Sequence, residues 1–175
     1  MPDPSQVSTV LGLAALVAGL VAMIAVAAAS LFAIRNQQTL ARTEKARLFM
    51  ELYRQYDTAE MHTAIYELLE WREAFGSRFD HQFAVEFAKQ SELGQRLDRA
   101  RRRVNRYFTT VAKLTTVGYI TRTTASILLN TQGLNVFYEI VMPMNDEKYG
   151  RLAASRKLVE VLKKIRPRYL NGGFG

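Results

Sequence analysis

The sequence predicts an all-α protein: one N-terminal transmembrane helix that continues into a stalk and a small helical bundle. Two observations lead to this fold class. The first is a run of 25 residues, 10–34, without a single charged side chain. The second is the spacing of apolar residues in the rest of the chain, which repeats every three or four positions and nowhere alternates convincingly with period two.

The uncharged run has the length of a membrane span. At ~1.5 Å per residue a helix of this length is about 37 Å long, and the hydrocarbon core of a bilayer is about 30 Å thick. Residues 1–9 contain no Lys or Arg, whereas Arg35, Arg42 and Lys45 follow the run closely. Because Lys and Arg favour the cytoplasmic side, we expect a bacterial inner-membrane protein with its N-terminus outside and residues 35–175 inside. A cleaved signal peptide is disfavoured, because the run is too long and no positive charge precedes it.

Small residues recur along one side of the predicted span at three- and four-residue spacing. Such a stripe lets a second helix approach closely, and packing then drives association within the lipid. We expect contact with a membrane-protein partner or with a second copy of the chain. The alternative is that alanine is common in this span for compositional reasons alone. The residues of the small-residue stripe are Ala15, Ala18, Gly19, Ala22, Ala25 and Ala29.

The first helices after the span follow from their apolar positions and end signals. Residues 36–56 predict a stalk helix whose apolar positions thicken towards its C-terminal end. Asp57 and Glu60 have the spacing of a capping box, which predicts a second helix over 58–75 that ends at Gly76. A shorter helix over 81–89 follows.

The fourth predicted helix, 92–117, has the clearest amphipathic spacing, and Gly118 after it indicates a Schellman ending. A short helix capped by Thr121 or Thr123 comes next. Gly133 and Pro143 are then expected to bound a separate segment, and a last helix is expected over 148–165. The predicted organisation is 1–9 N-terminus, 10–34 transmembrane helix, 35–56 stalk, 57–165 helical domain and 166–175 basic flexible tail.

Charge is distributed unevenly along the chain, whose formal net charge is +8. Residues 1–98 carry 9 basic and 12 acidic side chains, whereas residues 99–175 carry 15 basic and 4 acidic ones. Such asymmetry indicates an anionic partner. For a chain tethered to the cytoplasmic leaflet, the nearest anionic surface is the membrane lipid itself.

The most basic local sequence lies on the fourth predicted helix. Arg99, Arg102, Arg103 and Arg106 share the face opposite the apolar stripe, whereas Arg101 falls beside that stripe. The shared face could bind anionic lipid or a phosphorylated ligand. The alternative is a solvated face paired with the acidic second helix through Glu67, Glu70 and Glu73. Nucleic acid is disfavoured, because no nucleic-acid-binding motif is present.

Catalytic and ligand motifs are missing from the sequence. It has no phosphate loop, no dinucleotide fingerprint, no nucleophile elbow and no zinc-type His-Glu-x-x-His. It also has no cysteine, and its two histidines, His62 and His81, are far apart. We therefore expect no catalytic residue, no metal ligand and no cofactor, and so not an enzyme.

Three segments together resemble a known family. They are residues 49–61, the basic-aromatic residues 101–120, and residues 135–140 after a Leu-rich stretch. Their order resembles a bacterial family of single-span membrane proteins described only as a domain of unknown function. The resemblance implies a span, a stalk and a small cytoplasmic helical domain, and it implies no activity and no site residues.

Two functions remain open at the level of sequence. The first is a membrane-anchored, non-catalytic interaction or accessory subunit of a cytoplasmic-membrane complex, packing through the small-residue stripe and a cationic helical domain. The alternative is a regulatory or sensor module whose arginine-rich helix binds anionic lipid or a phosphorylated ligand.

Overall fold

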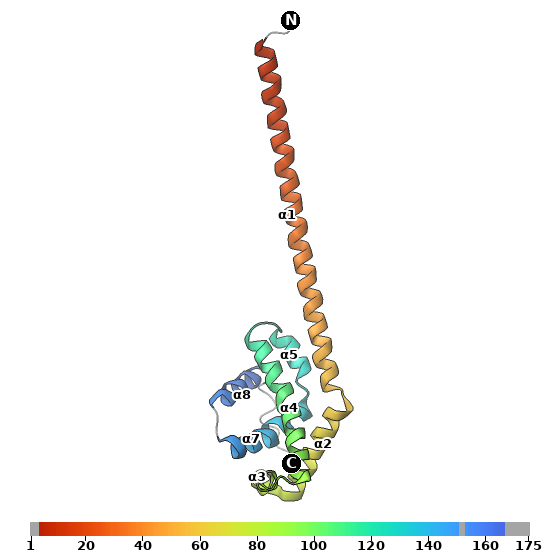
Figure 1. The fold of residues 1–175 in the computed structure, drawn as a ribbon, viewed down its shortest axis with the longest axis vertical. Helices are drawn as coiled ribbons and strands as arrows, with labels where there is room; N and C mark the ends of the chain where they lie inside the picture. The colour runs from red at the N-terminus through yellow and green to blue at the C-terminus, as the bar shows by residue number, and fades with distance from the viewer. Residues whose placement is uncertain (1–3, 151–152, 167–175) are drawn as a thin grey trace. The chain divides into compact units, whose positions relative to one another are not determined.

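The computed structural model describes residues 4–150 and 153–166, without the side chains of residues 4–22, 24, 25, 27 and 153–155. All regular structure in this described part is helical, which confirms the all-α prediction (Figure 1). The chain divides into two compact units, residues 1–44 and 45–175. We describe each unit by itself.

The first unit is the N-terminal part of helix α1, which runs from Pro4 to Tyr56. Its described side chains are all exposed, and the large apolar ones are between 51% and 67% exposed. Among the described residues no helix is both long and apolar enough to cross a membrane. The side chains of residues 10–22, which make up half of the predicted span, lie outside the described ones. The exposed apolar residues of this unit are Met23, Val26, Leu31, Phe32, Ile34 and Leu40.

The second unit begins with the last turns of α1, where burial starts. Leu48 is half-buried and Leu52 is buried. Helix α2 (Ala59–Phe75) then begins after Thr58, whose hydroxyl accepts a hydrogen bond from the Met61 N–H at 3.2 Å. The capping-box prediction was wrong by one residue: the hydroxyl of Thr58, rather than the carboxylate of Asp57, lies at the N-cap. The predicted end at Gly76 is confirmed by its positive φ of 54°.

A 3-10 turn, η1 (Gly76–Arg78), leads into α3 (Phe79–Ala88) and then into α4 (Glu92–Thr116). Ser91 caps α4 by accepting a hydrogen bond from the Gly94 N–H at 2.9 Å. Gly94 allows α3 and α4 to approach closely, because a Cβ atom there would lie 2.5 Å from the carbonyl oxygen of Glu86. The predicted ending of α4 is confirmed: Gly118 has a φ of 79°, and the Tyr119 N–H donates to the Leu114 carbonyl at 3.0 Å.

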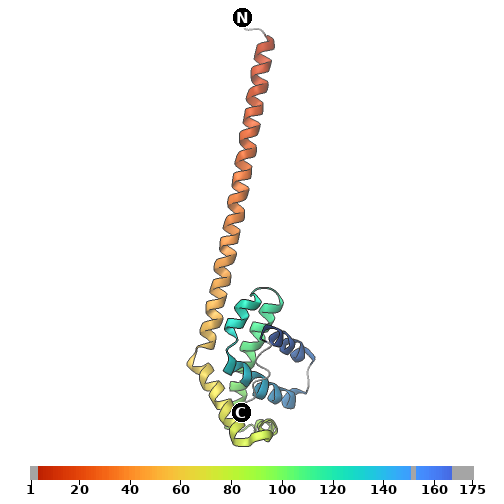
Figure 2. The same ribbon diagram turned by 180° about the vertical axis from the view of Figure 1, so that it is seen from behind.

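Helix α4 is the centre of the second unit, and α2, α3, α5 and α8 contact it (Figures 1 and 2). Its apolar stripe is buried against these neighbours, as the sequence predicts. The Tyr107 hydroxyl donates to the Leu128 carbonyl at 2.9 Å, and burial raises the pKa of this phenol. The buried apolar residues of α4 are Leu97, Ala100, Val104, Tyr107, Phe108, Val111 and Ala112.

The C-terminal third corrects two expectations. After α5 (Arg122–Leu128), which Thr121 caps, Gly133 lies inside α6 (Thr131–Val136) rather than between helices. It packs so closely that a Cβ atom would lie 2.5 Å from the Tyr56 hydroxyl. The smallest residue is therefore needed for packing here and does not mark a break.

Pro143 likewise does not stop the chain. A π-helical turn, η2 (Phe137–Val141), continues directly into α7 (Met142–Tyr149), and Pro143 lies in the first turn of α7. The Met142 N–H donates to the Phe137 carbonyl across this junction, so the helical backbone continues through a residue that has no N–H of its own. The last helix, α8 (Ala153–Ile165), starts after Gly150 and so begins later than predicted. The predicted tail lies outside the described residues except for Arg166.

Candidate functional site

The arginine-rich helix α4 places its basic side chains in two very different environments. Its apolar stripe fixes which positions face the core. Arg101 lies next to that stripe and is only 2% exposed, whereas Arg99, Arg102, Arg103 and Arg106 are exposed. We first describe the buried arginine and then the exposed set.

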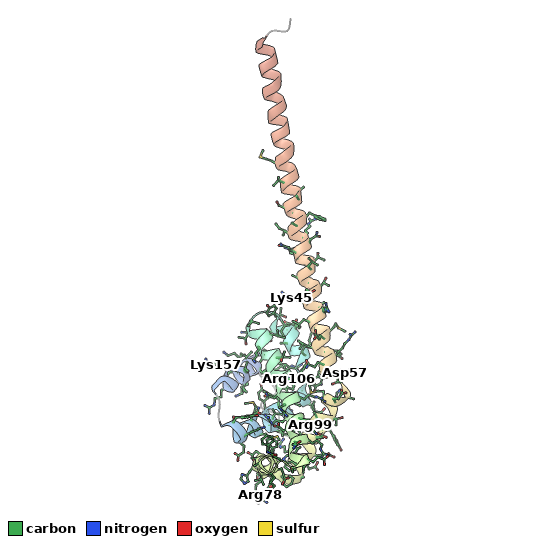
Figure 3. The ribbon with its side chains drawn as sticks, in the orientation of Figure 1. Lys45, Asp57, Arg78, Arg99, Arg106 and Lys157 are labelled. Atoms are coloured by element: carbon green, nitrogen blue, oxygen red, sulfur yellow. The ribbon has the colours of Figure 1, made fainter. Side chains whose placement is uncertain are left out.

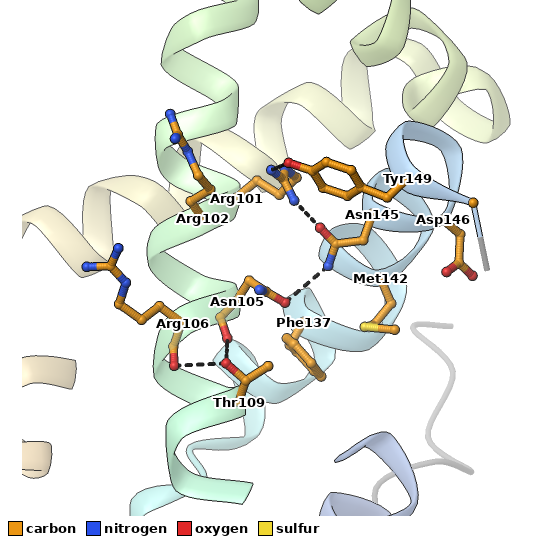
Figure 4. Close-up of a pocket in the computed structure, with 11 residues that line it drawn as sticks. Arg101, Arg102, Asn105, Arg106, Thr109, Phe137, Met142, Asn145, Asp146 and Tyr149 are labelled. Carbon is orange, nitrogen blue, oxygen red and sulfur yellow. Dashed lines mark hydrogen bonds between the residues drawn. The ribbon is translucent and has the colours of Figure 1, made fainter. Parts of the chain in front are cut away.

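Arg101 is held by a buried carboxylate on its own helix. Asp98, which is 3% exposed, accepts hydrogen bonds at Oδ1 from Nη2 of Arg101 at 2.7 Å and from its Nε at 3.1 Å. Nη1 of Arg101 donates to the side-chain oxygen of Asn145 on α7, as Figure 4 shows. A buried ion pair is tolerated when further hydrogen bonds satisfy its polar atoms. The Asp98–Arg101 pair receives such a hydrogen bond from Asn145 on α7.

Helix α7 supplies two further residues, Lys148 and Tyr149, and a second hydrogen bond of Asn145 to the same cluster. Lys148 donates to Oδ1 of Asp98 at 2.9 Å, and its ammonium nitrogen lies 3.4 Å from the ring centroid of Phe87 on α3. The hydroxyl of Tyr149 lies 3.3 Å from Nη2 of Arg101 and accepts from it. The side-chain amide of Asn145 donates to Asn105 on α4 at 3.1 Å. The cluster therefore joins α3, α4 and α7.

Two ionisable groups of the cluster have shifted pKa values. Burial alone would raise the pKa of Asp98, but hydrogen bonds from Lys148 and Arg101 outweigh it, and the pKa lies below its ordinary value. Burial would also raise the pKa of Tyr149, yet the same two cations hold it below the ordinary value. Both shifts have one cause: the cluster contains more positive than negative charge.

Arg102 links the cluster to the surface. Its Nε lies 3.0 Å from Oδ2 of Asp98, although the arginine side chain is 62% exposed. One buried carboxylate thus faces three cations: Arg101, Arg102 and Lys148. The cluster therefore has a net positive charge, and the exposed guanidinium of Arg102 brings part of this charge to the surface.

A cavity of about 430 Å³ lies beside this cluster, between α4 and α7. Asn105, Asn145 and Tyr149 line it, with Phe137 and Met142 as its apolar wall. Arg102 and Arg106 also line this α4–α7 cavity, but Figure 4 shows their guanidinium groups extending away from Asn145 and Tyr149. Their stems contribute to the wall, and their charges reach the surface.

Arg99 and Arg103 lie instead at a second depression, of about 290 Å³, between α2 and α4. Glu60 and Glu67 line this α2–α4 depression too. Glu67 lies 3.5 Å from Arg96, a residue outside the predicted set. The predicted pairing with the acidic helix is therefore made by Arg96. Within the described part of the chain, Arg99, Arg103 and Arg106 have no ion-pair partner.

The small-residue stripe is the other predicted site. Its residues all lie within α1, whose backbone is helical throughout. The side chains of Ala15, Ala18, Gly19, Ala22 and Ala25 lie outside the described ones, and Ala29 is exposed. Its packing role stays a prediction.

The sequence interpretation missed the buried cluster. Asp98 lies three and four residues before Arg101 and Arg102, a spacing that brings side chains together on a helix. With Arg101 beside the apolar stripe, that spacing was the available signal. The contributions of Asn145, Lys148 and Tyr149 had no local signal, because they are more than 40 residues away.

In the described part of the chain, no group of three or more His, Cys, Asp or Glu side chains could hold a metal ion. His62 and His81 each lie 3.4 Å from one exposed carboxylate, of Asp57 and Glu147 respectively.

No protein-family model matches this chain, and no curated protein or solved structure is significantly similar to it. The resemblance to a single-span bacterial family therefore stays a prediction that rests on the sequence segments alone.

Proposed function

We propose that this chain is a membrane-anchored, non-catalytic accessory subunit of a complex in the bacterial cytoplasmic membrane. The observation that carries the proposal is the uncharged run 10–34 within a single helix. The described side chains near its end, such as Leu31 and Phe32, are large, apolar and more than 60% exposed. A helix that exposes such residues on all sides is stable when they are buried, and lipid or another transmembrane helix can bury them.

The simplest test of the anchor is extraction of membranes with alkaline carbonate. An integral protein stays in the pellet, whereas a peripheral one is released. The proposal predicts that the full chain remains in the pellet. Recovery of the chain in the supernatant would overturn it.

The accessory role is tested by capture in mild detergent through a C-terminal tag. Replacing Ala18, Gly19 and Ala22 together by Leu removes the small surface that a second helix needs, so the stoichiometric membrane partner is expected to be lost. The matched control is Val17→Leu, which adds bulk on the opposite side of the helix by sequence register. Equal recovery of the partner by both variants would contradict the packing role.

The second candidate function is a sensor module whose α4 arginines bind anionic lipid or a phosphorylated ligand. It is favoured by three exposed guanidinium groups, of Arg99, Arg103 and Arg106, that have no ion-pair partner among the described residues. Reversing these three charges should abolish binding of the full chain to inorganic phosphate or to phosphatidylglycerol. Arg102 is left unchanged, because its pairing with Asp98 would confound the result.

A further inference from the structure

We propose that the end of the second unit formed by α1 and α5 docks on the anionic headgroups of the membrane that holds the anchor. The inference rests on the proposed membrane anchor. It adds a second membrane contact made by the folded domain itself, through residues that neither candidate function uses.

The surface is an apolar groove of about 420 Å³ between the start of the second unit and α5. Phe49 and Met50 of α1 line one side, and Tyr119 and Ile127 line the other. Three of these four side chains are strongly exposed: Met50 is 46% exposed, Tyr119 62% and Ile127 60%. Exposed apolar residues gathered in one place mark a contact surface.

The turn between α4 and α5 contributes Tyr119 to this groove and exposes a further apolar side chain two residues earlier. Val117, which is 65% exposed, precedes Gly118 and Tyr119 in the turn. The left-handed conformation of Gly118 reverses the chain and leaves the two large side chains beside it in solvent. We call the set Met50, Val117, Tyr119 and Ile127 the α1/α5 patch.

The turn side of the α1/α5 patch carries only positive charge, whereas its α1 side carries Glu44 and Glu51 beside Lys45 and Arg47. Lys45 lines the groove, and Lys113 and Arg122, both exposed, bracket the turn. No Asp or Glu occurs anywhere between Asp98 and Glu139. Aliphatic and Tyr side chains among Lys and Arg are the composition of surfaces that lie at the headgroup layer. Charge complementarity thus favours an anionic bilayer as the occupant.

The tether makes this contact reachable. Only residues 35–44 separate the predicted span from Lys45, which lies at the groove. Even fully extended, the chain from Ile34 to Lys45 reaches no more than about 40 Å. Figure 3 labels Lys45 at this end of the second unit and Arg78 at the opposite end. Of the two ends of the domain, the one carrying the α1/α5 patch is therefore the one attached to the anchor by a short segment.

The test uses the full chain, which has no cysteine of its own. Three single-cysteine variants, Val117→Cys, Tyr66→Cys and Leu31→Cys, are labelled with an environment-sensitive fluorophore. Each is reconstituted in nanodiscs of phosphatidylcholine and phosphatidylglycerol, and quenching by a headgroup spin-labelled lipid is measured. Tyr66 is the matched control, because its side chain is 62% exposed on α2, away from the patch.

The proposal predicts quenching at position 117 and none at position 66, with the quenching at 117 lost at high salt or without phosphatidylglycerol. If position 31 is shielded from a quencher placed in the acyl chains, the anchor itself is wrong. If position 31 is quenched there but position 117 behaves like position 66, the anchor holds and the docking proposal is overturned. Quenching at 117 that persists at high salt would contradict the electrostatic part of the account.

Discussion

The inward and outward sides of helix α4 carry the same residue type for opposite purposes. Arg101 is buried, satisfied by Asp98, Asn145 and Tyr149, and joins α4 to α7. Two residues later, Arg103 is exposed and has no ion-pair partner among the described residues. The difference teaches that an arginine-rich helix is not automatically a binding surface, because the arginines on its inward side can be part of the core.

The largest expected effect comes from removing the buried carboxylate. Asp98→Ala leaves Arg101 buried without its counter-ion, which costs about 3–5 kcal/mol of unfolding free energy. Urea denaturation of the full chain in detergent measures this. Glu51→Gln, an exposed acid in the interior of α1, is the control and should change stability by no more than about 0.5 kcal/mol. Equal losses of unfolding free energy in both variants would show that the buried carboxylate contributes no more to stability than an exposed one.

The packing side of α4 is tested next by Gly94→Ala. The added Cβ would lie 2.5 Å from the backbone oxygen of Glu86, so α3 and α4 must move apart. Overpacking of this kind costs about 1–3 kcal/mol. The neighbouring Gln95→Ala, on the exposed side, should leave the urea midpoint close to that of the unchanged chain. A stabilising effect of Gly94→Ala would show that the close approach is not needed.

Lowering the pH should reduce the stability that the buried cluster on the inward side of α4 contributes. Because the folded-state pKa of Asp98 lies below its ordinary value, its contribution to stability is complete above the unfolded pKa, near 4, and is lost as pH falls through the folded pKa. Asp98→Asn should flatten this part of the profile of stability against pH. An unchanged acid limb in that variant would assign the pH dependence to other carboxylates.

The smallest expected effect on stability belongs to the outward arginines. Arg99→Gln, Arg103→Gln and Arg106→Gln, singly or together, remove charges without ion-pair partners in the described part of the chain. Each should change the unfolding free energy by no more than about 0.5 kcal/mol. Thermal and urea unfolding measure this. A larger loss would mean that these side chains stabilise the fold, as Arg101 does.

The sequence predicts those parts of the fold that depend on local signals. The stripe of α4, its glycine ending at Gly118 and the end of α2 at Gly76 follow from spacing and from residues that tolerate positive φ. Gly133 and Pro143 were misread because each is used for tertiary reasons. The first gives room to Tyr56, and the second lies in a first helical turn that follows a π-helical turn.

The candidate site was predictable only on its exposed side. Register alone places Arg99, Arg102, Arg103 and Arg106 away from the core. Whether they would pair with α2 depended on the distances between the two helices, and Arg96 rather than any of the four makes the ion pair with Glu67. The buried cluster depends on Asn145 and Lys148, whose distance along the chain hides the contact from any local pattern.

The most direct test of the two-sided account measures stability and partner recovery on the same pair of proteins. One is Arg101→Gln, and the other is Arg99→Gln, Arg103→Gln and Arg106→Gln combined. Each is unfolded in urea and, in parallel, captured from native membranes in mild detergent. We predict that Arg101→Gln lowers the urea midpoint, and that the triple variant keeps the midpoint but loses partner or anionic lipid from the captured material. A triple variant that unfolds as early as Arg101→Gln, or that retains everything the unchanged chain captures, would contradict the account.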